Sequence, residues 1–267
     1  MKIIVSTLVI LTLLSCKEAT KKDNVEPVEA ETEITRAQEN NYPEALIEVF
    51  DAHGGLKNFK SKRTLTFEIV KPSGNETHTV DLYSRKDKIE IPPVTLGFNG
   101  KDAWLLDEQK AYKGNAALYH NLMFYFYAMP FVLADPGIKY EVAEDLEYEG
   151  KNYPGIHISY NDGVGASSKD DYYLYYDSES HEMAWLAYTF TFGTDEKSDK
   201  LSFIRYNDWE GVDGVKLPKS ITWHVNDGKT IKEPRKTVVF ENSSLHEGSK
   251  PDAFYAVPGN AKVILKP

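Results

Sequence analysis

The sequence predicts a mainly β protein with a few helices (α+β), built on a single curved antiparallel sheet. Successive segments alternate apolar and polar residues with period two, which is the pattern of half-buried antiparallel strands. Turn sequences such as Asn99-Gly100 and Asp213-Gly214 separate these segments. One stretch, residues 118–133, has apolar residues at helical spacing and on most other positions. A helix that is apolar nearly all round must be buried, so we expect it to lie against or inside the sheet.

The N-terminus carries a targeting signal. Lys2 is followed by an apolar run over residues 3–14, which is too short to span a bilayer and is typical of a secretory signal. The tetrapeptide Leu13-Leu14-Ser15-Cys16 resembles the lipobox of bacterial lipoproteins. This resemblance implies a signal peptide of residues 1–15, cleavage before Cys16, and attachment of acyl chains such as palmitate. An ordinary cleaved signal with an incidental cysteine is the alternative.

The segment after the signal is acidic and poor in apolar residues. Cys16 is the only cysteine, so no internal disulfide can form. Residues 17–41 contain no aromatic residue and cannot bury enough surface to offset their ordering entropy. We therefore expect residues 16–41 to be a lipidated cysteine with a disordered acidic tether, followed by one folded domain over residues 42–267. The formal net charge of −10 argues against nucleic acid as a partner.

The folded domain is expected to open with a helix over residues 43–52. Pro43 suits the first helical turn, and Gly54-Gly55 provide the stop. His53 lies at the helix end, where its side chain can hydrogen-bond a free carbonyl group. We expect this structural role for His53 rather than a catalytic one.

Strands are expected on both sides of the apolar stretch. The first group covers residues 65–69, 80–82, 89–91, 96–98 and 103–106. The second group covers residues 140–147, 153–160, 172–176, 183–192, 200–209, 215–225 and 235–242. Turn-rich separators imply that both groups form successive hairpins. Each large apolar side chain contributes about 1.5–3 kcal/mol when buried, so the helix over residues 118–133 can fill the sheet without any ligand. The sequence is consistent with two roles for this helix, a plug that fills the sheet and the lid of a ligand cavity.

Several short motifs resemble the lipoprotein-localisation factor (LolA/LolB-like) family. They are His53-Gly54-Gly55 after the first helix, the segments 98–104 and 209–218, and the closing run over residues 238–258. The resemblance implies a half-open β-barrel with helices on the concave face, a cavity for acyl chains, and a place in a bacterial envelope. A soluble chaperone of that family is not lipidated, so Cys16 points toward the lipidated relatives.

Patterns for catalysis and metal binding are weak. The seven histidines show none of the close spacings of metal motifs, so we expect no metal and no cofactor. Asp208, Glu210 and Asp213 lack the ligand spacing of an EF-hand, and residues 163–169 lack the Walker spacing. We expect a non-enzymatic protein, with a hydrolase as a minor hypothesis.

The favoured function is binding of a hydrophobic ligand, a lipid or a lipoprotein acyl chain, by a monomer anchored to the outer membrane through its lipid. The anchored domain is expected to face the periplasm, with the cell surface as an alternative. Six residues are predicted to touch the ligand, three on the helix and three on the sheet: Leu122, Phe126 and Met129, and Leu65, Phe67 and Ile69. The rival hypothesis is a structural or assembly lipoprotein that binds a protein partner through its acidic surface.

Overall fold

The computed structural model describes residues 41–161, 169–194 and 196–264. The predicted signal peptide, Cys16 and nearly all of the predicted tether lie outside the described residues, as does most of the loop over residues 163–169. Residues 42–267 form one compact unit. In the described part of the chain, no helix is long and apolar enough to cross a membrane.

The described residues of this unit form thirteen strands in one sheet. Those before the apolar stretch are β1 (Thr64–Ile69), β2 (Glu76–Asp81), β3 (Asp87–Ile91), β4 (Val94–Phe98) and β5 (Ala103–Leu106). Those after it are β6 (Ile138–Tyr148), β7 (Lys151–Tyr160), β8 (Tyr172–Tyr176), β9 (Met183–Tyr188), β10 (Ser202–Val212), β11 (Val215–Asp227), β12 (Thr230–His246) and β13 (Lys262–Ile264).

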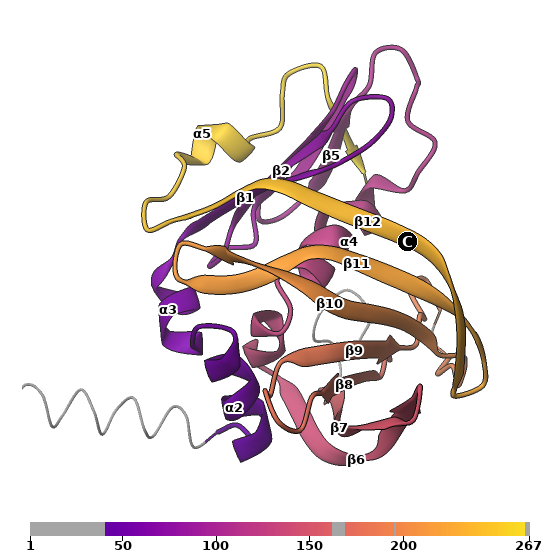
Figure 1. Cartoon of the computed structure of the whole chain (residues 1–267). Coiled ribbons are helices and arrows are strands. Elements are labelled where there is room, and N and C mark those ends of the chain that lie inside the picture. The colour runs from indigo at the N-terminus through magenta and orange to yellow at the C-terminus, as the bar shows by residue number, and fades with distance from the viewer. Residues whose placement is uncertain (1–40, 162–168, 195, 265–267) are drawn as a thin grey trace, which may run out of the picture. The chain divides into compact units, whose positions relative to one another are not determined.

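The sheet consists of two hairpin meanders, β1 to β5 and β6 to β12. The strand order is β13-β5-β4-β3-β2-β1-β12-β11-β10-β9-β8-β7-β6. The meanders join where β1 pairs antiparallel with β12, with Thr64 opposite His246. β13 and β6 form the two edges, so the curved sheet stays open (Figure 1). The predicted fold class, a mainly β protein on one curved antiparallel sheet with a few helices, is confirmed.

Irregular pairing accompanies the bend where the two meanders join. Between Thr66 and Glu68 of β1, the paired residue on β12 moves from Ser244 to Glu241, so β12 carries one extra residue. Asn242, in this bulge, has a φ of +54°. A bulge of this kind bends its strand and increases the local twist.

Four helices and one 3-10 helix accompany the sheet within the described residues: α2 (Glu44–Ala52), α3 (Leu56–Ser61), α4 (Ala116–Tyr127), η1 (Phe131–Ala134) and α5 (Asp252–Tyr255). The predicted first helix is confirmed as α2, which buries Leu46, Val49 and Phe50. The ring of Phe131 in η1 lies between Phe50 and Phe59, with centroid distances of 6.2 and 4.4 Å. α2, α3 and η1 therefore share one aromatic cluster.

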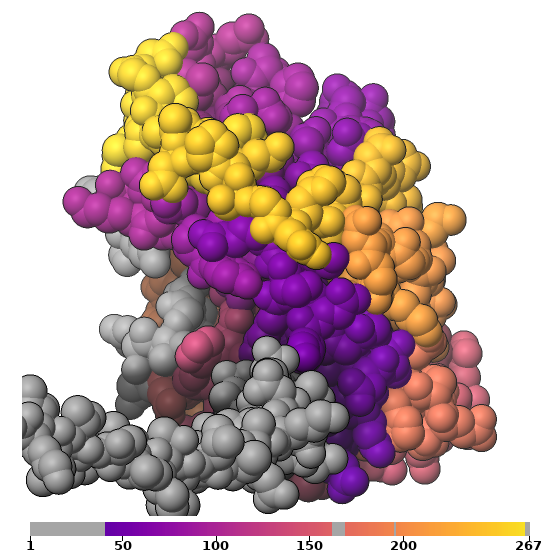
Figure 2. Space-filling view, turned by 90° about the vertical axis from the view of Figure 1, so that its left-hand side faces the viewer, coloured from indigo at the N-terminus to yellow at the C-terminus, as the bar shows by residue number. Residues whose placement is uncertain are grey.

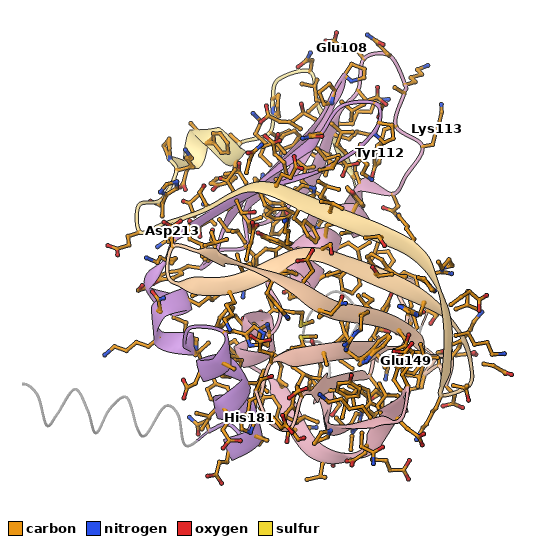
Figure 3. The ribbon with its side chains drawn as sticks, in the orientation of Figure 1. Glu108, Tyr112, Lys113, Glu149, His181 and Asp213 are labelled. Atoms are coloured by element: carbon orange, nitrogen blue, oxygen red, sulfur yellow. The ribbon has the colours of Figure 1, made fainter. Side chains whose placement is uncertain are left out.

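The junction between α2 and α3 rests on the turn between β10 and β11. The amide of Lys216 donates to the carbonyl of His53 at 2.8 Å. Asn58 of α3 donates to the carbonyl of Gly214 at 2.8 Å. Asp213, labelled in Figure 3, is part of the same turn and accepts from the amide of Leu245. This turn thus connects the helices to the end of β12.

The C-terminal segment packs on the first meander. The indole of Trp104 in β5 donates to the carbonyl of Tyr255 at 3.2 Å. Figure 2 shows this segment, in yellow, against the N-terminal strands. The short helix α5 and the edge strand β13 have no counterpart in the sequence prediction, and neither does α3.

Three predicted elements have wrong boundaries. The helix expected over residues 118–133 ends at Tyr127, and residues 131–134 form the separate helix η1. Pro130 explains the break, because proline has no amide hydrogen and keeps the preceding residue out of the helical region. The strand expected over residues 183–192 ends at Tyr188. Conversely, β12 extends well beyond the expected 235–242, since it pairs with both β1 and β11.

Candidate binding cavity beside helix α4

Helix α4 starts at a polar cap and is held in place near its end by the hydrogen bonds of two tyrosines. The side chain of Asn115 accepts hydrogen bonds from the amides of Ala117 and Leu118 at 3.0 and 3.3 Å. This satisfies two of the amides that a helix N-terminus leaves free. Tyr127, in the last turn, donates to Ser243 Oγ of β12 at 2.5 Å. Tyr206 of β10 donates to the carbonyl of Phe126 at 2.8 Å. These bonds fix α4 against strands from the second meander.

Two buried polar pairs fix α4 to the first meander. Tyr119 donates to Glu76 of β2 at 2.5 Å. His120 Nδ1 lies 3.0 Å from Asp87 Oδ2 of β3. Burial raises the pKa of Asp87 to about 6, although its contact with His120 acts in the opposite direction. Each pair joins α4 to a strand of the first meander, so we assign both pairs to positioning of the helix.

The inner side of α4 is part of the core. Phe124 and Tyr127 are completely buried. The Tyr127 ring lies 4.3 Å from the ring of Phe67 and 4.4 Å from that of Phe240, between centroids. Phe67 and Phe240 belong to β1 and β12, the strands that join the two meanders. This side of the helix therefore fills the concave face, as a plug would.

The outer side of α4 faces a cavity of about 570 Å³. Leu118, Leu122 and Phe126 line it from the helix. The opposite wall is aromatic and comes from β7, β8, β9 and the residues after β9: Tyr160, Tyr172, Tyr188, Phe190 and Phe192. Small-molecule sites usually have volumes of roughly 300–1,000 Å³, and this cavity lies within that range. Such sites are mostly lined by apolar and aromatic side chains.

A second cavity, of about 240 Å³, adjoins the first. Both are lined by Leu118, Leu122, Phe126, Tyr188 and Phe190. Ile69 of β1, Trp223 of β11 and Val238 of β12 are among the residues that line only the smaller one. The two spaces therefore meet over the outer side of α4.

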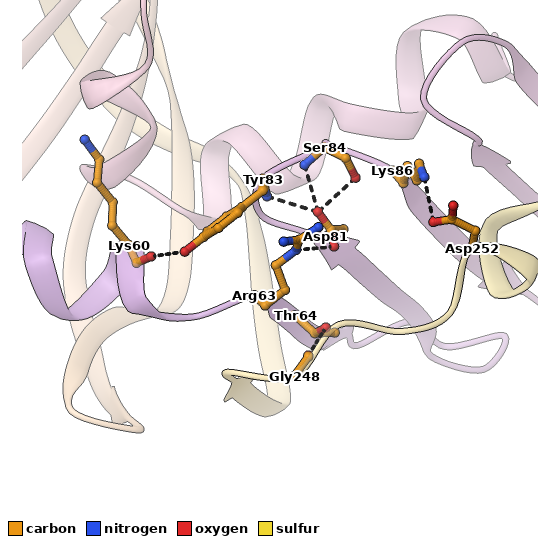
Figure 4. Close-up of polar contacts among 9 residues, drawn as sticks. All are labelled: Lys60, Arg63, Thr64, Asp81, Tyr83, Ser84, Lys86, Gly248 and Asp252. Carbon is orange, nitrogen blue, oxygen red and sulfur yellow. Dashed lines mark hydrogen bonds and ion pairs between the residues drawn. The ribbon is translucent and has the colours of Figure 1, made fainter.

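The turn between β2 and β3 supplies a charged wall of the larger cavity. Asp81 accepts from the amide and hydroxyl of Ser84 at 2.7 and 2.8 Å and from Arg63 Nε at 2.7 Å (Figure 4). The turn directs Arg85 into an ion pair with Asp135. The guanidinium carbon of Arg85 also lies 5.0 Å from the ring centroid of Phe124. Burial raises the pKa of Asp135, and the charge of Arg85 counteracts part of this rise.

The six residues predicted to touch a ligand lie in three different places. Leu122, Phe126 and Met129 line the larger cavity. Ile69 lines the smaller one. Leu65 and Phe67 are completely buried and line neither of the two cavities. Both belong to the core, where Phe67 packs against the rings of Tyr127 and Phe240.

The aromatic wall from the second meander was not predicted as part of the site. A sequence signal for it exists, because Tyr188, Phe190 and Phe192 alternate with Thr189 and Thr191. Residues two apart in an extended segment share one face. The three aromatic side chains could therefore have been placed together, but nothing local showed that they would face α4.

Outside the cavity, Asp208 and Asp213 have structural partners, and the acidic and histidine side chains of the described residues form no metal cluster. No cluster of three or more histidine, cysteine, aspartate or glutamate side chains suited to a metal occurs among residues 41–161, 169–194 and 196–264. Asp208 accepts from Ser220 at 3.1 Å, while Asp213 accepts from Leu245. These two acids of the predicted turn thus have separate structural partners.

Comparison with known proteins identifies the family. Residues 49–239 match the model of a protein family described as a family of unknown function, DUF6503. The chain belongs to the DUF6503 family. No curated protein matches it.

Solved structures similar to this DUF6503 member include a LolA superfamily protein from Nitrosomonas europaea. The two sequences are 10% identical, the match covers 78% of this chain and 96% of the other, and the TM-score is 0.47. An outer membrane lipoprotein-sorting protein domain from Vibrio parahaemolyticus has 10% identity, coverages of 85% and 97%, and a TM-score of 0.41. A DUF1329 family protein from Desulfovibrio piger has 9% identity, coverages of 78% and 95%, and a TM-score of 0.42. These structures include a member of the LolA superfamily, the family that the sequence motifs resemble.

Proposed function

We propose that the protein is a lipid-anchored protein of the bacterial envelope that binds an apolar ligand, a lipid or a lipoprotein acyl chain, in the cavity beside α4. It acts by binding rather than by catalysis. The observation that carries this proposal is the division of α4 into two sides. The inner side fills the core, whereas Leu122 and Phe126 on the outer side line a space of about 570 Å³.

The lining of this cavity suits an acyl chain. Leu122, Phe126 and Met129 face aromatic rings across the space. Each methylene group transferred from water to such surroundings contributes about 0.8 kcal/mol. The arginine in the wall is paired with Asp135, so its charge is already balanced. An uncharged hydrocarbon can therefore enter without displacing water from an unpaired arginine.

Titration with the uncharged dye N-phenylnaphthylamine tests this proposal. The dye fluoresces more strongly in apolar surroundings. We expect saturable binding to the purified full-length protein, with one main site per chain and displacement by dodecanol. A signal that does not saturate, or one that dodecanol leaves unchanged, would refute the proposal.

A further inference from the structure

The two cavities beside α4 differ in the charge of their walls. This difference matters for the ligand class, and the inference rests on the proposed function above. Both spaces meet at Leu118 and Leu122, so one elongated molecule can occupy them together. The charged groups at either end then determine which chemical group the molecule carries there.

The smaller cavity ends at two lysines, Lys71 and Lys236. Lys71 comes two residues after Ile69, the last residue of β1, and lines the same cavity as Ile69. Residues two apart on a strand share one face, so Lys236 lies on the face of β12 that carries Val238, which is buried. A lysine just after the end of β1 and a lysine of the adjacent strand β12 therefore lie at the same cavity.

This end of the smaller cavity carries a net positive charge once the ion pair between Lys71 and Glu76 is counted. Lys71 lies 3.3 Å from Glu76. Burial favours the neutral form of Glu76, but the nearby His78 ring, the hydroxyl of Tyr119 and Lys71 outweigh it and lower the pKa to about 2. Glu76 is thus ionised and balances Lys71. Lys236 Nζ lies 6.0 Å from the Trp223 ring centroid and has no carboxylate within ion-pair distance among the described residues.

The described residues that line the larger cavity show no such excess of positive charge. Arg85 is paired with Asp135. Asp170 also lines this space and accepts from the amide and hydroxyl of Thr191, each at 2.7 Å. An anionic group is therefore better placed at the lysines than beside Arg85.

We infer that the ligand is an amphiphile with an anionic head group, which lies between Lys71 and Lys236, while its hydrocarbon tail passes Leu118 and Leu122 into the larger cavity. The two lysines stand out in a chain whose formal net charge is −10. They attract the head group, and the apolar lining on either side of Leu122 holds the tail. The head group thus sets the orientation of the ligand.

Competition against N-phenylnaphthylamine tests the inference with three ligands that share one tail: dodecanoate, dodecanol and dodecylammonium. For the wild-type protein we expect dodecanoate to displace the dye at a concentration roughly fivefold lower than dodecanol, the size of one partly exposed ion pair. Dodecylammonium should be the weakest competitor. Added NaCl should reduce the ratio of dodecanoate to dodecanol, because it screens the lysines.

Charge reversal at one position gives the matched comparison. Lys236→Glu should abolish or invert the preference for dodecanoate while dodecanol binding stays the same. Lys219→Glu changes the net charge equally, at an exposed residue of β11 that lines neither cavity. This control should keep the wild-type preference.

Equal displacement by dodecanoate and dodecanol in the wild type, or the same loss of preference in both variants, would overturn the inference and leave the proposed function standing. Absence of dye binding altogether would refute the proposed function, and the inference with it. The two failures are therefore distinguishable.

Discussion

His53 shows how a single buried side chain connects a helix end to the sheet. It is completely buried, and its Nδ1 donates to the carbonyl of Val49 at 2.7 Å. Its ring meets Trp209 edge-on, with centroids 4.4 Å apart. The expected role, a hydrogen bond to a free carbonyl at the end of α2, is what the structure contains. Burial lowers the pKa of His53 to about 4, and the bond to Val49 opposes this shift only in part.

This lowered pKa predicts a loss of stability in acid. The unfolded chain takes up a proton at His53 near pH 6.5, whereas the folded protein does so only near pH 4. Between these values the unfolded state binds more protons, so stability falls as the pH decreases. We expect His53 to account for a decrease of about 2 kcal/mol in the free energy of unfolding between pH 7 and pH 5.

Urea unfolding at both pH values measures this effect. His53→Gln keeps a hydrogen-bonding side chain without a titrating ring, so it should reduce the pH dependence by about 2 kcal/mol. His246→Gln, at an exposed position, serves as the control and should leave the pH dependence unchanged. If the two variants behave alike, the assignment to His53 is wrong.

At the scale of elements, the contact of α2 with the β10–β11 turn depends on Gly54. A Cβ atom added there would lie 2.8 Å from Val215 Cα and would also meet the Gly214 carbonyl, and its φ of +96° already disfavours a side chain. Gly55 has a similar φ of +88°, but its nearest atom would be 3.9 Å away. Comparison of the two positions therefore distinguishes the cost of steric contact with the turn from the cost of backbone strain.

Substitution of each glycine by alanine tests this contact. Gly55→Ala should cost about 1 kcal/mol of unfolding free energy, because only the backbone conformation is disfavoured. Gly54→Ala should cost about 3 kcal/mol, because the turn must also move. Thermal or urea unfolding provides both values. Equal costs at the two positions would show that α2 does not rest closely on the turn.

The elements that could be predicted are those with local signals. Alternation and turn residues such as Asn99-Gly100 set the successive hairpins, and most strands lie where they were expected. The pairing of β1 with β12 depends on segments far apart in the chain, so no local pattern specifies it. β13 has only three residues and pairs with β5, which leaves too short a stretch for alternation to be seen.

The lining of the cavities was predictable on the helix and less so on the sheet. Leu122, Phe126 and Met129 lie on one stripe of α4 and its extension, and all three line the larger cavity. Leu65 and Phe67 share the concave face with Ile69, but period-two alternation cannot tell a residue under a packed ring from one beside a cavity. The contribution of Tyr188, Phe190 and Trp223 depends on how far the sheet curves around α4. That curvature arises from pairing between distant strands.

At the scale of the whole molecule, the proposed function depends on the N-terminal lipidation signal that the sequence predicts. Cys16 provides the thiol that acylation requires, so Cys16→Ala should remove the acyl mass and release the protein from the membrane fraction. Ser15→Ala keeps a small residue before the cysteine and serves as the matched control, which should stay lipidated. Mass spectrometry and fractionation measure both effects. A Cys16→Ala variant that stays with the membrane, together with a wild type that carries no acyl mass, would refute lipid anchoring.

The whole domain is organised around α4, whose inner side completes the core and whose outer side lines a cavity. Leu122 lies at the meeting point of the two spaces and is only partly buried. A larger side chain there can occupy the cavity without entering the core. Leu106, a partly buried residue of β5, lines neither cavity and offers a matched position.

The most direct test is the affinity of Leu122→Trp for N-phenylnaphthylamine, measured beside Leu106→Trp and the wild type. We expect binding to Leu122→Trp to weaken by about tenfold or more, which corresponds to about 1.4 kcal/mol, because the indole occupies space that the dye would use. Leu106→Trp should bind like the wild type, and both variants should unfold at wild-type urea concentrations. Unchanged affinity in a folded Leu122→Trp protein would contradict the account.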